Sequence, residues 1–172
     1  AQFTFVPAAG AVLAEWGAEV IKVEHPARGD GMRGHGLDKN GQPLWWKMIS
    51  RNKRTVALNL SDPDGAQALR RLAENADVLV ENFSTGVTRR LGVDPDAMLA
   101  VNPRLVYTSI TGFGTDNPGK AMDSVIQALS GAMFTSGAPD DDPVRFGLPI
   151  GDLLAPMYAV IGTLAALRDR DA

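Results

Sequence analysis

Residues 55–81 read TVALNLSDPDGAQALRRLAENADVLVE, and this stretch decides the fold. Its first part, residues 55–60, alternates side chains in the way that a strand does. Ser61 and the proline two positions later then favour the start of a helix, because serine caps the first free amides and proline fits the first turn. Residues 77–81 are a second strand, nearly all apolar at its centre as buried parallel strands are. The stretch therefore predicts a strand–helix–strand unit with parallel strands.

The same alternation of strands and helices extends in both directions from this unit. Further strands are expected at residues 19–24 and 104–110. Helices are expected at residues 8–16, 61–75, 87–91, 94–101, 122–133 and 152–168, and a long loop at residues 25–47. Parallel neighbours in a sheet need crossover connections, which are usually helical. The whole chain therefore predicts an α/β fold with a mostly parallel sheet and flanking helices.

The composition narrows the possible functions. Among the 172 residues, 17 Lys and Arg face 20 Asp and Glu, and the net charge of −3 argues against a general binder of nucleic acid or anionic membranes. There is no cysteine, which excludes disulfides, thiolate metal sites and thiol catalysis, and with two histidines a histidine-rich metal site is not expected. No apolar run approaches the roughly 20 residues that span a bilayer. Because the first residues also lack a basic n-region, we expect a cytoplasmic protein.

Two short motifs stand where α/β proteins bind ligands or perform chemistry. Asn82-Phe83 follows directly after the apolar strand 77–81. Open α/β sheets bind ligands at the carboxyl ends of their strands, although a turn asparagine beside a core phenylalanine is an equally good interpretation. Gly151-Asp152 stands immediately before the apolar helix at 152–168. Asp152 is either a helix N-cap or a carboxylate that the helix dipole keeps ionised, as a nucleophile must be.

Taken together, these segments resemble the class III CoA-transferase family, the CaiB/BaiF type, which includes formyl-CoA transferase and carnitine CoA-transferase. The likeness is carried by residues 16–24 (WGAEVIKVE), residues 52–60 (NKRTVALNL), residues 77–83 (DVLVENF) and Gly151-Asp152 with its apolar helix. Between them, in family order, lie Arg90-Leu91-Gly92, residues 102–107 (NPRLVY) and Gly112-Phe113-Gly114. Each motif alone is weak, but their order along essentially the whole chain makes the resemblance specific.

The resemblance implies an architecture and an assembly. Family members are considerably longer, so residues 1–172 correspond to the N-terminal portion of the large domain, without its first strand and its C-terminal remainder. The large domain of the family has a Rossmann-like core. Two long family subunits interlock as a homodimer, and we expect the same of the full-length protein.

The resemblance also implies a reaction between an acyl-CoA and a carboxylic acid. The catalytic aspartate of the family falls on Asp152, which would attack the acyl-CoA carbonyl to give an aspartyl–acyl anhydride and free CoA thiolate. The thiolate would then form an aspartyl-CoA thioester, from which the incoming carboxylate takes the CoA, and no metal is required. The CoA-contacting positions of the family fall on His25, Leu58, Asn82, Phe83, Arg90 and Lys120. Arg90 and Lys120 would neutralise phosphates of CoA, and Leu58 and Phe83 would flank its apolar or aromatic parts.

Two other functions stay open at this point. An alpha-methylacyl-CoA racemase of the same family has a Gly-His-Asp motif, and the matching stretch here is Ala121-Met122-Asp123. A thioether cannot exchange protons, so Met122 removes one of the two bases and favours transfer over racemisation. A non-catalytic CoA-binding module would keep the basic contacts and have no need of Asp152.

Overall fold

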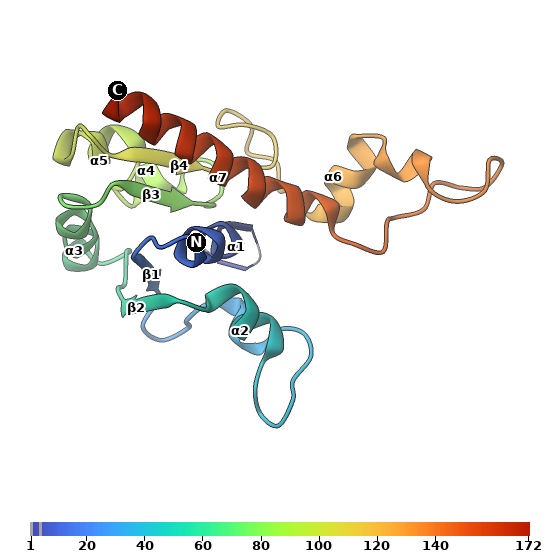
Figure 1. Cartoon of the computed structure of the whole chain (residues 1–172), viewed down its shortest axis with the longest axis horizontal. Coiled ribbons are helices and arrows are strands. Elements are labelled where there is room, and N and C mark those ends of the chain that lie inside the picture. Colours follow the sequence, from blue (N-terminus) through green and yellow to red (C-terminus); the bar gives the residue numbers. More distant parts are fainter. Residues whose placement is uncertain (1, 4) are drawn as a thin grey trace.

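The computed structural model describes residues 2–3 and 5–172, and Figure 1 shows how their helices and strands are arranged. In chain order the elements are α1 (Phe5–Glu15), β1 (Val20–Glu24), the 3-10 helix η1 (Gly31–Gly34), α2 (Leu44–Ser50), β2 (Lys53–Ala57), α3 (Pro63–Ala73), β3 (Val78–Glu81), α4 (Val87–Arg90), α5 (Pro95–Val101), β4 (Val106–Ser109), α6 (Asp123–Leu129), the 3-10 helix η2 (Ala132–Thr135) and α7 (Ile150–Asp171). The α/β fold with parallel strands and flanking helices is confirmed.

The described strands form two parallel sheets rather than one. β1 pairs with β2, with Val20 opposite Lys53, and β3 pairs with β4, with Val78 opposite Val106. Within residues 2–3 and 5–172, each of the four strands has one edge that no other strand pairs with. The predicted sheet is thus present as two halves of two strands each.

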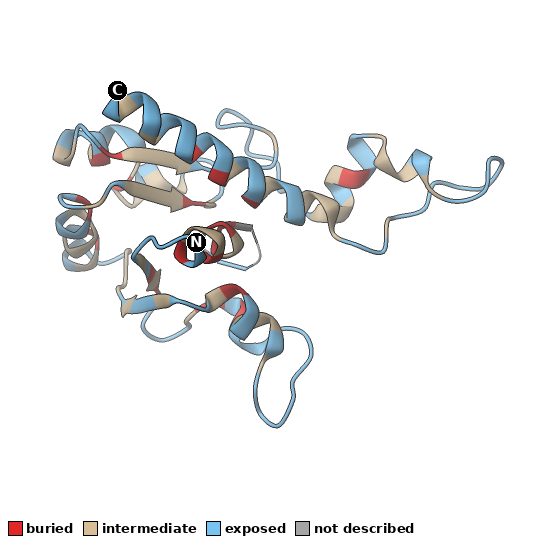
Figure 2. Ribbon diagram, viewed as in Figure 1, coloured by how far each residue is buried: buried red, intermediate tan, exposed pale blue. Residues whose placement is uncertain are grey.

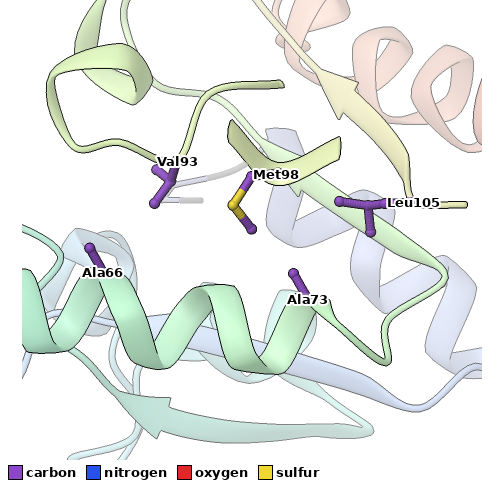
Figure 3. Packing of buried hydrophobic residues seen from close by; sticks show 5 residues of the cluster. All are labelled: Ala66, Ala73, Val93, Met98 and Leu105. Carbon is purple, nitrogen blue, oxygen red and sulfur yellow. The ribbon is translucent and has the colours of Figure 1, made fainter. Parts of the chain in front are cut away.

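Helices cover both faces of the β3–β4 sheet, because successive side chains of a strand point to opposite faces. Leu79 and Tyr107 lie opposite each other in the register and pack against a buried cluster on the side of α3 and α5. The cluster consists of Ala66, Ala73, Val93, Met98 and Leu105 (Figure 3). Thr108 points to the other face, where its hydroxyl lies 2.7 Å from the hydroxyl of Thr163 in α7.

Two ion pairs, one of them buried, connect β1 to the segment that follows it. The Lys22 ammonium contacts the Asp30 carboxylate at 2.6 Å, and both side chains are almost wholly buried. The buried Glu24 accepts hydrogen bonds from the guanidinium of Arg33 at 2.8 and 3.0 Å. That guanidinium in turn lies over the ring of Trp46, 4.0 Å from its centre. These contacts attach the segment after β1 to the strand itself.

Lys53, the first residue of β2, lies close to this ionic cluster. Its ammonium donates to the backbone carbonyls of Pro7 in α1 and Ile49 in α2, and so joins these helices to the strand. Burial and the nearby charge of Lys22 lower the pKa of Lys53 to about 8. Lys53 is therefore a partly buried anchor between the strand and these helices.

Four differences from the sequence prediction have a local reason. Residues 25–47 are not one loop, because Asp30 caps η1 through the amide of Met32 and because α2 begins at Leu44. α3, the helix within residues 55–81, is capped by Asp62 and not by Ser61, since the Asp62 carboxylate accepts from the Asp64 amide at 2.9 Å.

The other two differences concern a strand and a helix. β2 spans Lys53–Ala57 rather than residues 55–60, so Leu58 directly follows the strand. The helix expected at 122–133 ends at Leu129, because Gly131 takes a left-handed conformation with φ of 77°, and η2 follows.

α7 is the longest helix, and most of its apolar surface is exposed (Figure 2). The exposed side chains are Leu153, Leu154, Met157, Tyr158, Ile161 and Leu164. By length and composition alone this helix could cross a membrane, so the expectation that no apolar run reaches that length is wrong. A single such helix is weak evidence for a membrane span. Ion pairs from Arg170 to Asp77 at 3.0 Å and from Arg104 to Asp171 at 2.8 Å tie its C-terminal end to the sheet.

Candidate active site

The predicted CoA-contacting residues follow the carboxyl ends of the strands. His25 directly follows β1, Leu58 directly follows β2, and Asn82-Phe83 directly follow β3. The Leu58 amide donates to the Glu24 carbonyl at 2.8 Å, which places the ends of β1 and β2 side by side. This edge of an α/β sheet is where ligands bind.

A cavity of about 1150 Å³ brings four of the predicted residues together: His25, Leu58, Phe83 and Arg90. The cavity lies between the two half-sheets and is lined by the full lengths of β1 and β3. Its walls are mainly apolar, and near the strand ends they carry both acidic side chains (Glu24 and Glu81) and basic ones (Arg28 and Arg90). Neither Lys120 nor Asp152 lines it.

Asn82 and Phe83 are positioned by hydrogen bonds at the end of β3. The Asn82 side chain forms a pair of bonds with the backbone of Gln2, accepting at 3.0 Å and donating at 2.9 Å. The N-terminal segment therefore lies across this end of the strand. The Phe83 amide donates at 2.6 Å to the carboxylate of Glu81, which is only 5% exposed. Glu81 was not predicted as a site residue, although an acidic residue ending an apolar strand was a usable signal.

Arg90 also lines a second cavity of about 340 Å³, which carries a concentration of positive charge. Arg70, Arg89 and Ser61 lie on the same walls. The Arg70 guanidinium is oriented by two hydrogen bonds to the Gly92 carbonyl, at 2.6 and 3.1 Å. Guanidinium groups gathered in this way suit a phosphate-bearing ligand.

His25 has one ring nitrogen committed to the backbone. Its Nδ1 accepts from the amides of Ala27 at 3.2 Å and Arg28 at 3.3 Å, so Nδ1 carries no proton and the proton of the neutral ring lies on Nε2. The ring is partly exposed and borders the larger cavity. His25 can therefore offer a hydrogen-bond donor toward the cavity.

Lys120 lies on an exposed loop that the structure brings near Phe83. The Thr85 hydroxyl, in the loop after β3, donates to the Asn117 carbonyl at 2.9 Å. This bond joins the segment that carries Lys120 to the segment that carries Phe83. The two loops can thus contact one ligand together, although Lys120 itself is exposed.

Asp152 is the third residue of α7 and is partly buried. The N-cap position belongs to Pro149, so the interpretation of Asp152 as a helix cap is wrong. Its place in the first turn still puts the carboxylate near the positive end of the helix dipole. The first amides of α7 instead donate to a carboxylate of α6. Asp123 Oδ1 accepts from the amides of Gly151 at 2.8 Å and Asp152 at 3.4 Å.

In the sequence Asp123 stands out only as the neighbour of Met122 in the stretch Ala121-Met122-Asp123. Met122 itself is 67% exposed and stands at the N-cap of α6. Among the described residues, no group of three or more His, Asp or Glu is arranged as a metal site would require.

Comparisons with known proteins place this fold in a family. The sequence profile described as CoA-transferase family III matches residues 1–172. The chain is 38% identical over 168 residues to the succinyl-CoA–D-citramalate CoA-transferase of Chloroflexus aurantiacus, covering 95% of this chain and 42% of that protein. It is 41% identical over 169 residues to the formyl-CoA:oxalate CoA-transferase of Streptomyces avermitilis, covering 96% and 41%. The crystal structure of a CaiB/BaiF family protein from Brucella suis matches with a TM-score of 0.91 and 34% identity, over 99% of this chain and 47% of that one.

The chain therefore belongs to CoA-transferase family III, the CaiB/BaiF group. It spans about two fifths of the length of the curated relatives that it matches. The family resemblance read from the sequence is confirmed, and the homology supports CoA transfer in general terms.

Proposed function

We propose that the full-length protein transfers CoA from an acyl-CoA thioester to a carboxylic acid, with Asp152 as the nucleophile. The observation that carries the proposal is the position of Asp152 in the first turn of α7, in a chain that belongs to a family of CoA-transferases. Both relatives named above are transferases between a CoA thioester and a carboxylic acid, which supports the same substrate classes here.

The proposed reaction proceeds through covalent steps on Asp152. The carboxylate adds to the acyl-CoA carbonyl and expels CoA thiolate, leaving a mixed aspartyl–acyl anhydride. The thiolate then attacks the aspartyl carbonyl, which releases the donor acid and forms an aspartyl-CoA thioester. The acceptor carboxylate attacks that thioester and expels the thiolate, and the resulting anhydride is opened by the thiolate at the acceptor carbonyl, which restores Asp152. The energy of the thioester is kept throughout, as covalent catalysis allows.

The proposed CoA site extends along the carboxyl ends of the strands. Arg90, with Arg70 and Arg89 beside it, would hold phosphate groups of CoA, and Leu58 and Phe83 would flank its apolar or aromatic parts. Asn82 and His25 would supply hydrogen bonds, and Lys120 a further charge from its loop. The CoA is a substrate, and the proposed chemistry needs no metal.

Mass spectrometry of the full-length protein tests this function directly. During turnover with a panel of acyl-CoAs, hydroxylamine should convert an activated Asp152 to its hydroxamate, a mass change confined to the peptide that contains Asp152. The matched control omits the acyl-CoA. A protein that transfers CoA without any adduct on this peptide would contradict the proposed intermediate. Fast incorporation of solvent deuterium at the α-carbon of a 2-methylacyl-CoA would instead favour the racemase, despite Met122.

We also propose that residues 1–172 are the N-terminal portion of a large, Rossmann-like domain of a cytoplasmic protein that forms an interlocked homodimer. The free edges of β1 and β3 line the 1150 Å³ cavity from opposite sides, which supports a further strand between them. The exposed apolar side chains of α7 support a covering by the remainder of the protein or by the partner subunit.

Residues 1–172 prepared alone are therefore expected to self-associate, because free strand edges and exposed apolar helix surface both promote association. Light scattering should show oligomers whose mean mass grows with concentration, whereas the full-length protein should give one discrete species. The substitutions Leu154→Lys and Tyr158→Lys in α7 should reduce the association. The control substitution Leu99→Lys, at an exposed position of α5, should not. A monodisperse monomer that melts cooperatively would contradict the proposal.

A further inference from the structure

We propose that Asp123 and Gln127 of α6 are positioning residues that hold the start of α7, and thereby Asp152, in the geometry for attack. These two side chains are called the Asp123–Gln127 clamp below. The inference rests on the proposed function, because it assigns the clamp a part in the same reaction.

Asp123 supplies the start of α7 with the acceptor that the helix itself lacks. The first amides of a helix have no partners within it. Pro149, at the N-cap, makes no side-chain hydrogen bond to them. Asp123 Oδ1 instead accepts from the Gly151 amide at 2.8 Å and, more weakly, from the Asp152 amide at 3.4 Å. The carboxylate thus caps α7 from another helix and fixes the backbone that carries Asp152.

Gly151 makes this close approach possible. A Cβ added at Gly151 would lie 3.2 Å from Asp123 Oδ1 and 3.5 Å from Cγ2 of Ile126. A larger residue would push the Asp123 carboxylate away from the amides that it caps. The glycine before Asp152 therefore serves the contact with Asp123.

Gln127 orients the Asp123 carboxylate and also ties down the segment that leads into α7. Its side chain is 2% exposed, and its amide nitrogen donates to Asp123 Oδ2 at 2.7 Å and to the Leu148 carbonyl at 3.1 Å. Its amide oxygen accepts from the Phe146 amide at 2.9 Å. A buried amide with partners at both ends has one preferred orientation. The clamp therefore fixes α7 and the segment before it with one connected set of bonds.

The clamp lies apart from the proposed CoA contacts and is expected to act on the rate rather than on CoA affinity. The charge of Asp123 is partly balanced by Arg145, whose guanidinium lies 3.9 Å from Oδ2. His25, Leu58, Phe83 and Arg90 line a cavity that neither Asp123 nor Gln127 borders. A shift of the nucleophile by about 1 Å can lower a rate by roughly 100-fold, so a small movement of residues 151–152 would be visible in kcat.

The test compares Gln127→Leu and Asp123→Asn in the full-length protein with the wild type. Gln127→Leu removes all the bonds of the buried amide. Asp123→Asn is nearly isosteric, but its amide group must face either the Gly151 amide or the Gln127 amide, both of which are donors. Both variants should lower kcat by about 10- to 100-fold while KM for the acyl-CoA stays within about threefold. Asp94→Asn is the matched control, since Asp94 caps α5 in the same manner through the Ala97 amide, and its kcat should stay at the wild-type value.

Hydrogen exchange of the amides of residues 150–153, followed by mass spectrometry, gives a readout that needs no turnover. Exchange there should be faster in both clamp variants than in Asp94→Asn. Wild-type kcat in the clamp variants would overturn the inference, as would a raised KM at unchanged kcat. If the wild type forms no adduct on Asp152, the proposed function fails separately. In that case faster exchange still supports the positioning of Asp152 by the clamp, and unchanged exchange overturns it.

Discussion

Asp152→Asn in the full-length protein is expected to lower the rate of CoA transfer by at least about 1000-fold, the scale on which enzymes lose activity with their nucleophile. The amide is nearly isosteric with the carboxylate but cannot form an anhydride. Because Pro149 occupies the N-cap, the substitution removes no cap, and it weakens the interaction of a first-turn charge with the helix dipole. That interaction contributes about 0.3–1 kcal/mol at exposed positions, so the melting temperature should change little. Steady-state transfer rates and thermal unfolding of the same preparations are the measurements.

Another acidic residue of α7 provides the control for this substitution. Asp169, near the C-terminal end of the helix, is exposed and lines neither of the two cavities described above. Asp169→Asn should leave transfer within about twofold of the wild type, as surface substitutions far from a site commonly do. An Asp152→Asn protein that transfers CoA at nearly the wild-type rate would remove Asp152 from the mechanism. A large fall in melting temperature with lost activity would indicate a folding role instead.

The strands and most helices could be predicted because their signals are local. The strand at β3 is read from consecutive apolar residues, and α5 spans Pro95–Val101 where the sequence predicts a helix at residues 94–101. The cap of α3 was assigned one residue too early, because serine and aspartate stand side by side at Ser61 and Asp62 and both cap well. α2 was missed since its first residue follows a stretch rich in glycine and charge, and its buried face is provided by tertiary contacts such as that of Ile49.

Site residues could be predicted from the sequence only where their position directly after a strand determines where they lie in the fold. Residues that follow parallel strands must meet at one edge, which is why His25, Leu58 and Phe83 come to line one cavity. The family resemblance indicated Asp152, but the sequence does not show what holds it. Asp123 lies 29 residues from Asp152, and nothing in the intervening residues marks their contact. The partners of a helix start depend on how helices pack, which local patterns do not contain.

The buried ion pair between Lys22 and Asp30 in the β1–β2 half shows the same dependence on tertiary structure. Lys22, in an alternating strand, would ordinarily face solvent. The segment after β1 folds back and brings Asp30 against it, and both side chains become almost wholly buried. Asp30 also accepts from the amides of Met32 at 2.9 Å and Phe3 at 3.1 Å. A carboxylate with this many donors keeps the segment after β1, and with it His25, attached to the sheet.

Asp30→Ala is therefore expected to lower the free energy of unfolding by about 3–5 kcal/mol, the cost of removing one partner from a buried ion pair. Asp38→Ala is the matched control, because Asp38 also accepts a backbone amide in the same segment but is exposed, and it should cost about 1 kcal/mol or less. Urea unfolding of the full-length protein at pH 7 measures both. A loss below about 1 kcal/mol for Asp30→Ala would show that the buried pair is not a main support of this half.

The pH dependence of the difference in unfolding free energy between the wild type and Asp30→Ala gives a sharper test. Burial alone would raise the pKa of the Asp30 carboxyl, but the hydrogen bond and charge of Lys22, with the backbone amides, hold that pKa below its usual value. A carboxyl whose pKa is lower in the folded state than in the unfolded state stabilises the protein fully above the unfolded pKa, about 3.9 for aspartate. The stabilisation is lost as the pH falls through the folded pKa. The gap in unfolding free energy between wild type and Asp30→Ala should thus be constant from pH 7 to about pH 5 and shrink below about pH 4. A gap that stays constant into strong acid would assign the loss to packing rather than to the charge of Asp30.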